Sequence, residues 1–286
     1  MGKIGVQAMM LKNEFEADGA FTTLKRLNEL GFNAVEISQI PMSEANVGEM
    51  DRARDELGME IAALSANLEA TSGPRGDSLI DSFDKIVADC RQLACSRVRI
   101  GMMPFSAMAS EQALLNFCSQ INEIAGRLAE ADIGLYYHNH HNEFARYDGE
   151  YVLDIIRAKA PLLGFELDVH WIHRGGEDPV GILKEYAGLV DLVHLKDYRI
   201  GPMPEDALKA REVGDSAAFM AGFLGIVQFA EVGEGNLDFP AIIDQSLASG
   251  AKYLFIEQDD QYGRTPFDCL ATSRDNLIRL GYGDLF

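Results

Sequence analysis

The sequence predicts a closed barrel of eight parallel strands surrounded by helices. Short apolar runs alternate with longer segments of helical period along almost the whole chain. Strands that alternate with helices pair in parallel through right-handed crossovers, and eight such units form a (β/α)8, or TIM, barrel. A length of 286 residues is ordinary for one domain of this kind. We therefore predict a single TIM-barrel domain over residues 1–286.

Eight apolar or β-branched runs are expected to form the strands. They occupy residues 4–9, 34–38, 61–65, 97–101, 133–138, 164–169, 189–195 and 252–257. A helical segment follows each run; Leu79, Phe83, Ile86 and Cys90, for example, mark one helical stripe. An open doubly wound sheet is the alternative, but it would usually show a glycine-rich turn after its first strand, and residues 9–13 contain no glycine.

One long segment, residues 198–239, interrupts this alternation after the seventh strand. It contains an amphipathic piece at 207–213 and an apolar piece at 219–227. Long loops at the carboxyl ends of barrel strands commonly carry function. We expect this insertion to cap the active site or to form a contact in a homo-oligomer.

The composition excludes several classes of partner. A net charge of −20 argues against nucleic acid, which needs a basic surface, and gives no support for binding anionic membranes. The chain has no apolar run of membrane-spanning length, and its four cysteines show no disulfide spacing. A reduced, cytoplasmic protein that acts on a small molecule fits these properties best.

All six histidines lie in one window of the chain, close to the predicted ends of strands five, six and seven. They are His138, His140, His141, His170, His173 and His194. Functional groups of a (β/α)8 barrel come from the carboxyl ends of its strands. Imidazoles and carboxylates that converge there are the ligands of a hard or borderline divalent metal.

Carboxylates follow the same strands. Glu143 lies near the end of strand five, Asp168 ends strand six and Glu257 ends strand eight. A carboxylate within an apolar strand is costly to bury alone, so it needs a cation or several hydrogen bonds. This pattern predicts a metal site at one end of the barrel.

Four further residues could contact a substrate. Lys196 could hydrogen-bond it or stabilise an oxyanion, although a salt bridge to Asp197 is an equal alternative. Trp171 could pack on the apolar face of a sugar or simply belong to the core, and His170 lies beside it. Glu36, at the end of strand two, could contact substrate or pair with a side chain of a neighbouring strand.

The chain resembles the xylose-isomerase-like TIM barrels, a superfamily of sugar isomerases and epimerases that also contains inosose dehydratases and endonuclease IV. The resemblance covers nearly the whole chain. It rests on Tyr137-His138-Asn139-His140 with Glu143-Phe144, Leu167-Asp168-Val169-His170-Trp171, Val193-His194-Leu195-Lys196-Asp197, Glu231-Val232-Gly233-Glu234-Gly235 and Ile256-Glu257-Gln258-Asp259. The resemblance implies one divalent ion, often manganese, with magnesium, cobalt or zinc as other options, and it implies Asp168, His194 and Glu257 as ligands.

The fourth ligand is where this sequence departs from many relatives. They carry a Glu in a Glu-Asn-His stretch, and here that position reads His138-Asn139-His140. We predict Glu143 as the fourth ligand, with His138 or His140 as the alternative. The candidate catalytic groups are then Glu143, Glu257, His138, His140 and Lys196.

The predicted reaction is isomerisation or epimerisation of a sugar or keto-sugar. A divalent ion can stabilise the negative charge of an enediolate, and a base then removes the α-proton. A metal-dependent lyase, which would dehydrate an inosose or eliminate from a 3-keto-glycoside, is the first alternative because it uses the same intermediate. An endonuclease at abasic DNA sites and a non-catalytic sugar-binding protein are the remaining, weaker hypotheses.

Overall fold

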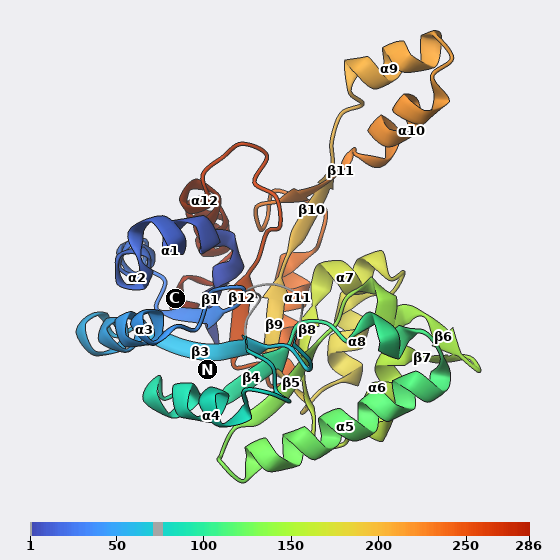
Figure 1. The fold of residues 1–286 in the computed structure, drawn as a ribbon. Coiled ribbons are helices and arrows are strands. Elements are labelled where there is room, and N and C mark those ends of the chain that lie inside the picture. The colour runs from blue at the N-terminus through green and yellow to red at the C-terminus, as the bar shows by residue number, and fades with distance from the viewer. Residues whose placement is uncertain (1, 71–76) are drawn as a thin grey trace.

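The computed structural model describes residues 2–70 and 77–286, in which eight parallel strands close into one barrel (Figure 1). The strands pair in the order β1-β12-β9-β8-β5-β4-β3-β2, and β2 pairs with β1. They are β1 Lys3–Gln7, β2 Ala34–Ile37, β3 Glu60–Ala66, β4 Arg97–Ile100, β5 Gly134–His138, β8 Gly164–Asp168, β9 Val190–Leu195 and β12 Tyr253–Ile256. The predicted fold class is confirmed, and every strand lies within two residues of its predicted bounds.

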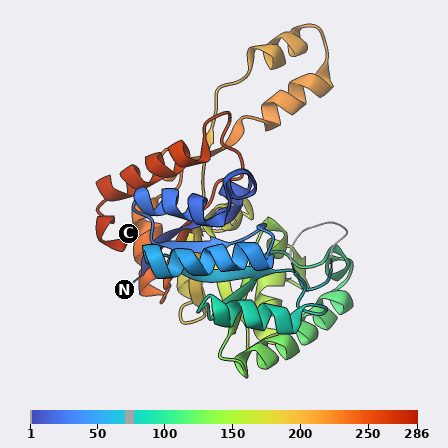
Figure 2. The same ribbon diagram turned by 60° about the vertical axis from the view of Figure 1, so that its left-hand side comes forward.

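Helices cover the outside of the barrel between successive strands (Figures 1 and 2). They are α1 Lys12–Asp18, α2 Ala20–Glu29, α3 Glu44–Leu57, α4 Phe83–Gln92, α5 Glu111–Ala129, α6 Val152–Lys159, α7 Val169–Arg174, α8 Pro179–Glu185, α11 Phe239–Ala248 and α12 Pro266–Arg279. Side-chain caps start several of them: Ser43 and Ser110 accept hydrogen bonds from the backbone of Asn46 and Ala113. Short 3-10 helices are η1 Ala8–Leu11, η2 Phe105–Met108, η3 His141–Phe144 and η4 Gly283–Leu285.

One helix begins later than the sequence predicts. Leu79 and Ile80 precede α4 in a turn, and the helix starts at Phe83. The Ser78 hydroxyl accepts a hydrogen bond from the backbone N–H of Asp81 at 3.0 Å. Local serine bonds of this kind stabilise turns at the expense of helix. The apolar Leu79 side chain is nevertheless fully buried, which explains why it matched the helical stripe.

The insertion after β9 forms an arm. Its base is an antiparallel hairpin of β10 Asp197–Ile200 and β11 Val227–Ala230, and its outer part holds α9 Glu205–Glu212 and α10 Ser216–Leu224. The two helices project away from the barrel in both views (Figures 1 and 2). A second, smaller hairpin joins β6 Arg146–Tyr147 to β7 Glu150–Tyr151.

The barrel interior is apolar towards one end and charged towards the other. Close strand packing is visible at Gly5, where an added Cβ would lie 2.6 Å from the Ala34 carbonyl oxygen. By contrast, Glu36, Arg99, Glu166 and His194 all have side chains inside the barrel and are at most 4% exposed. Buried charges on rigid strands indicate where the functional site lies.

The four cysteines are buried and free, as expected for a reduced protein. Within residues 2–70 and 77–286, no helix combines the length and apolar character needed to cross a membrane.

Candidate active site

Four potential metal ligands meet at the carboxyl ends of four adjacent strands. His138 ends β5, Asp168 ends β8, His194 lies in β9 and Glu257 follows β12. One ligand atom of each lies within 4.8 Å of the others, and all four residues are buried. The strand register explains the convergence, because Asp168 pairs directly with His194 across β8 and β9. We call these four residues the ligand cluster.

Each carboxylate of the ligand cluster is held by one oxygen. The Oδ1 atom of Asp168 accepts a hydrogen bond from the backbone N–H of Trp171 at 2.9 Å, which caps α7. The Oε1 atom of Glu257 accepts one from Nε2 of Gln7 at 3.1 Å. The second oxygen of each, and Nδ1 of both His138 and His194, are buried and make no hydrogen bond of good geometry among the described residues, although Nδ1 of His194 lies within 4 Å of both carboxylate oxygens. Such atoms normally have a partner, and a divalent cation would supply one.

The charges around the cluster also fit a cation. Among the described residues, five carboxylates converge here, from Glu36, Glu166, Asp168, Glu257 and Asp259, against the cations Arg99 and Lys196. Burial would lower the pKa of His194, but these acids outweigh it and raise the pKa well above its ordinary value, so the imidazole adds a positive charge as long as no metal displaces its proton. Burial alone would raise the pKa of Glu257, but the charges of Lys196 and His194 outweigh it and hold the pKa well below its ordinary value. The chain therefore keeps this carboxylate ionised and ready to bind a cation.

A second layer of charges lies directly beneath His194. Its Nε2 atom is 3.3 Å from Oε2 of Glu36 and 3.2 Å from Oε1 of Glu166, while its Nδ1 atom is 2.7 Å from Oε2 of Glu257. A carboxylate that binds one imidazole nitrogen leaves the other free to ligate and sets the tautomer. The layer therefore orients Nδ1 of His194 towards the ligand cluster.

Arg99 links the two carboxylates of this lower layer. Its Nη2 atom is 2.7 Å from Oε1 of Glu36, and its Nε atom is 3.1 Å from Oε2 of Glu166. Burial favours the protonated forms of both, yet the charges of Arg99 and His194 together outweigh burial and lower the pKa of Glu36. The pKa of Glu166 is instead raised, by burial and then by the negative charge of Glu36.

Lys196 lies on the open side of the ligand cluster. Its Nζ atom is 2.7 Å from Oδ1 of Asp259 and 3.3 Å from Oε2 of Glu257. Burial would lower the pKa of Lys196, but Glu257 and the neighbouring acids outweigh it and raise the pKa above its ordinary value. Lys196 is thus a buried ammonium group, and Asp197 is not its ion-pair partner. Asp197 instead accepts backbone hydrogen bonds from Gly233 and Gly235.

Aromatic side chains surround Lys196. Its Nζ atom lies 4.9 Å from the Trp171 ring and 5.2 Å from the Phe229 ring. Phe229 comes from β11 at the base of the arm, and its ring centroid is 5.1 Å from that of His170. The arm therefore contributes one aromatic wall to the site, which agrees in part with the expectation that the insertion caps it.

Two of the three histidines beside Trp171, His140 and His170, are neutral. Burial, followed by the charge of Lys196, lowers the pKa of His140 to about 4 and that of His170 to about 3. Nδ1 of His140, both ring nitrogens of His170 and Nε1 of Trp171 have no partner in the described parts of the chain. Unpartnered donors and acceptors next to aromatic rings suit a hydroxylated ligand.

Glu143, which we predicted as the fourth ligand, lies outside the ligand cluster. Its Oε1 atom accepts a hydrogen bond from the Tyr137 hydroxyl at 2.6 Å, and its Oε2 atom accepts one from the backbone N–H of His140 at 2.8 Å. Both oxygens are therefore occupied in fixing the η3 turn. His138, the alternative from the sequence, takes the fourth position of the cluster.

The other predicted residues separate into two groups. The structure brings Asp168, His194, Glu257 and Lys196 together, with His140, His170 and Trp171 beside them. Glu36 is fully buried and pairs with a side chain, as the second of its two expected roles proposed, but the partner Arg99 lies on β4, two strands away, and not on an adjacent strand.

Sequence reasoning missed Glu166 and Arg99. A usable signal existed for Glu166: it precedes Asp168 by two positions, and residues i and i+2 of a strand share one face. For Arg99, the signal was a charge between the apolar residues Val98 and Ile100. Phe229 carried no local signal, because only the folded hairpin brings it to the site.

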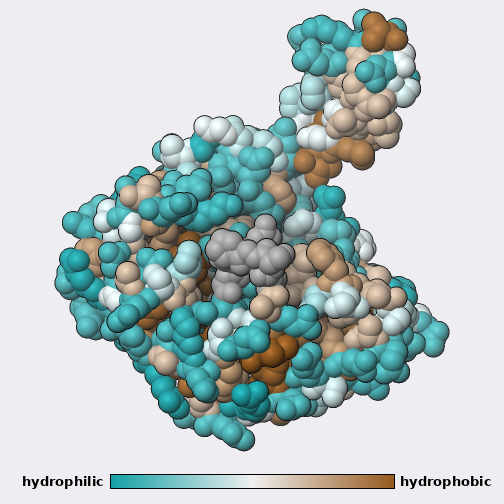
Figure 3. Space-filling view, viewed as in Figure 1, coloured by the Kyte–Doolittle hydropathy of each residue, from teal (hydrophilic) through white to brown (hydrophobic). Residues whose placement is uncertain are grey.

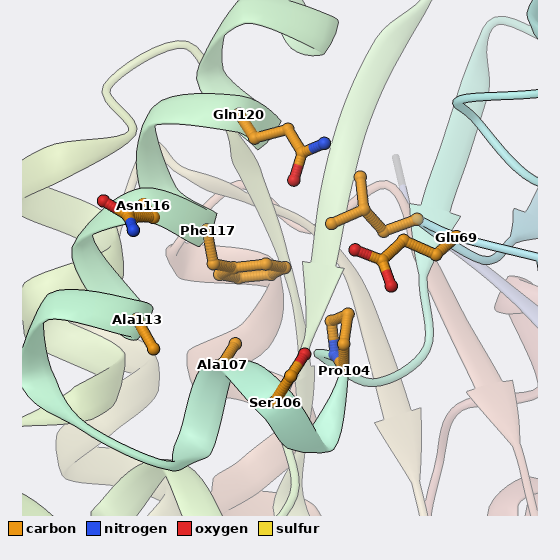
Figure 4. A pocket seen from close by; sticks show the side chains of 9 residues that line it. Glu69, Pro104, Ser106, Ala107, Ala113, Asn116, Phe117 and Gln120 are labelled. Atoms are coloured by element: carbon orange, nitrogen blue, oxygen red, sulfur yellow. The ribbon is translucent and has the colours of Figure 1, made fainter.

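A separate pocket of about 220 Å³ lies between η2, α5 and the segment that follows β3 (Figure 4). Phe117 forms one wall, and Glu69 and Gln120 supply polar groups. It shares no residue with the ligand cluster, so we do not assign it to the reaction.

The sequence model of the family described as xylose isomerase-like TIM barrel matches residues 24–273. The chain belongs to this family. A curated relative, the rhizopine catabolism protein MocC of Rhizobium meliloti, is 28% identical over 163 residues. That match covers 56% of the present chain and 48% of MocC, so it spans about half the length of the relative.

Two solved structures share the fold. A sugar phosphate isomerase/epimerase from Parabacteroides distasonis has a TM-score of 0.76 at 20% identity, with 98% of this chain and 99% of that chain covered. The probable 3-DHS dehydratase AsbF of petrobactin synthesis from Bacillus anthracis has a TM-score of 0.69 at 16% identity, with 97% and 99% covered. At these identities the likeness concerns the fold.

Proposed function

We propose that this xylose isomerase-like TIM barrel is a divalent-metal-dependent isomerase or epimerase of a sugar or keto-sugar. The observation that carries the proposal is the ligand cluster, whose unpartnered carboxylate and imidazole atoms converge beside a buried ammonium group. Family membership supports the same class of chemistry.

His138, Asp168, His194 and Glu257 would hold the ion. Two imidazoles with two carboxylates suit a borderline divalent ion, and we propose manganese before magnesium, cobalt or zinc. When bound, the ion supplies Lewis-acid stabilisation of the negative charge that develops on a substrate carbonyl oxygen.

The chain's own residues then provide the proton chemistry. Lys196 is held as an ammonium and can donate a hydrogen bond to a substrate oxygen as negative charge develops there. His140 is neutral and has an unpartnered Nδ1 atom, so it can accept the α-proton of the substrate. Glu257 is the second candidate base because it is ionised and adjoins Lys196. Together they can move a proton through an enediolate to either carbon or either face.

The substrate would lie against the aromatic wall. Trp171 and Phe229 offer apolar faces, and His170 offers ring nitrogens that no described residue uses. A sugar has apolar C–H faces and polar edges, so it matches both kinds of surface. Trp171 and Phe229 contact each other edge to face, with ring centroids 6.4 Å apart, so we place the non-reacting part of the sugar against the wall that the two rings form together.

Solvent exchange tests the reaction. The manganese-loaded protein should incorporate deuterium from D2O at the α-carbon of a substrate from a panel of aldoses, ketoses and 3-keto-glycosides, as followed by NMR. Exchange with conversion and without loss of water supports isomerisation or epimerisation. Loss of water or of a glycosidic group would instead establish the lyase. Absence of exchange with every sugar of the panel would contradict both.

Metal content tests the ligands. His138→Ala and Asp168→Asn should each lose stoichiometric metal by mass spectrometry of the purified protein. Glu143→Gln is the matched control: it removes a buried charge nearby but should retain the metal, because Glu143 lies outside the ligand cluster. Loss of metal from Glu143→Gln with retention in His138→Ala would restore Glu143 as the ligand.

A further inference from the structure

The helix α10 is apolar on every side and exposed. Its sequence, Ser-Ala-Ala-Phe-Met-Ala-Gly-Phe-Leu, contains no charged residue, and within the described structure none of its residues is buried. Met220 is 46% exposed, Phe223 47% and Leu224 66%. A helix that is hydrophobic all round normally lies in a protein interior. Another surface must therefore cover α10 in the native protein.

The arm itself covers only one side of this helix. α9 and α10 approach closely, because a Cβ added at Gly222 would collide with the Cβ of Ala207. The opposite side of α10 faces away from α9, and Val213 in the turn between the helices is 82% exposed. Figure 3 shows tan and brown side chains along the arm, away from the mostly teal barrel.

We propose that α10 is the self-association surface of this protein and that two copies pair arm to arm. Two helical hairpins that meet through the same face form a closed, two-fold arrangement of four helices. Such pairing buries the α10 helix of each copy against the α10 helix of the other, so that no apolar face of the arm remains exposed. The assembly is a closed dimer, because each copy uses the same self-complementary surface and has no second such surface for a third chain.

Charge disfavours an anionic membrane as the occupant and restricts pairing of two copies to an uncharged surface such as α10. The chain carries a net charge of −20, so two copies repel each other wherever their acidic surfaces meet. The uncharged α10 is a place where they can approach without that cost. The same net charge disfavours an anionic membrane as the occupant, although an exposed apolar helix could otherwise insert there.

The size of the arm agrees with a stable dimer. The helical part of the arm, residues 201–226, falls in the range of roughly 20 to 30 residues that each partner contributes to an interface of standard size. Its large exposed side chains include Leu208, Val213, Met220, Phe223 and Leu224. They provide the apolar centre that such interfaces need.

Sedimentation velocity on the full chain, from micromolar concentrations upwards, tests this proposal. The wild type should have the mass of two chains. The double substitution Met220→Glu with Leu224→Glu should give monomers and weaken association by roughly thirtyfold or more, as expected when central apolar contacts are lost. Leu162→Glu, at a 58% exposed leucine on the barrel, is the matched control and should remain dimeric.

A cysteine cross-link tests the arm-to-arm contact. Ala221→Cys places a thiol on exposed α10, whereas the four native cysteines are buried. Mild oxidation should join two chains covalently in the wild-type background and fail in the double variant. A monomeric wild type, a dimer that the double variant preserves, or binding of the wild type to vesicles in place of dimerisation would each overturn the proposal. Circular dichroism of both variants should match the wild type, because α10 contributes nothing to the barrel core.

Discussion

His194 connects two layers of buried charge within the barrel. One ring nitrogen faces Glu36 and Glu166, and the other faces Asp168 and Glu257. The lower carboxylates therefore fix the orientation of an imidazole whose other nitrogen points into the ligand cluster. Arg99 in turn stabilises Glu36 and Glu166, because its positive charge compensates two carboxylates that are not exposed to solvent.

Arg99→Met should therefore destabilise the protein strongly. The substitution leaves Glu36 and Glu166 buried without their cation, and breaking a buried ion pair costs about 3–5 kcal/mol. Urea denaturation followed by circular dichroism would measure the loss. Lys25→Met, which removes a largely exposed cation 3.9 Å from Glu29, serves as the control and should change stability little. Equal stability of Arg99→Met and wild type would show that Arg99 does not compensate these carboxylates.

Phe229→Ala should weaken substrate binding more than it slows the chemistry. The ring lies beside Lys196 and His170 but has no group that could move a proton. Loss of one aromatic face costs about 1 kcal/mol, which corresponds to a rise in KM of roughly fivefold at nearly unchanged kcat. Phe223→Ala, in the same insertion but outside the site, is the control for steady-state kinetics. A fall in kcat at constant KM would assign Phe229 a role in the reaction step itself.

The sequence allowed much of this site to be predicted, for a geometric reason. Asp168, His194 and Glu257 end or follow strands, and strand ends of a barrel always converge. Strand five was ambiguous because His138, His140 and Glu143 lie within one short stretch. The η3 turn decides among them, since it occupies both oxygens of Glu143 and leaves His138 at the strand end. Sequence spacing carries no information about such a turn.

At the scale of elements, the barrel strands were predictable and the arm was not. Most strand residues are buried, so most of the strands are largely apolar runs between turns. The apolar segment 219–227 had the same appearance, yet it forms most of the exposed helix α10 and the start of β11. An apolar sequence predicts that a segment is buried, but it does not indicate whether the segment is buried by the same chain or by another chain.

Asp197 should hold the base of the arm. Its carboxylate accepts hydrogen bonds from the backbone N–H groups of Tyr198, Gly233, Gly235 and Leu237, at 2.8 to 3.3 Å. Asp197→Ala removes both acceptor oxygens and all four hydrogen bonds, so the amides of Gly233 and Gly235 should exchange with solvent much faster.

Asp215→Ala is the matched control for this change. Asp215 caps α10 through one hydrogen bond, to the backbone N–H of Ala218 at 3.0 Å. Its loss costs about 1 kcal/mol of helix stability and should leave the amides at the base of the arm protected. Hydrogen exchange measured by mass spectrometry distinguishes the two variants. Unchanged protection in Asp197→Ala would show that backbone contacts alone hold the base.

At the scale of the whole molecule, the proposed ion would connect strands that are distant in the chain. His138 and Glu257 come from opposite ends of the run β5-β8-β9-β12, which makes up half of the closed barrel. One ion held by all four strands would tie this half together. Conversely, the acidic cluster without its cation keeps like charges close in a dry interior.

Metal removal should therefore lower the stability of the entire barrel. A ligand that binds only the folded state stabilises it by about 2.7 kcal/mol when present at a hundred times its Kd. For a domain somewhat above 250 residues, that corresponds to a rise in Tm of roughly 5 °C. Thermal unfolding of chelator-treated protein with and without manganese would measure the shift. Asp168→Asn should abolish this rise in Tm. The substitution replaces a negatively charged ligand oxygen of the ligand cluster with a neutral amide and adds no new charge. An equal shift in that variant would place the ion elsewhere and remove the main support for the proposed site.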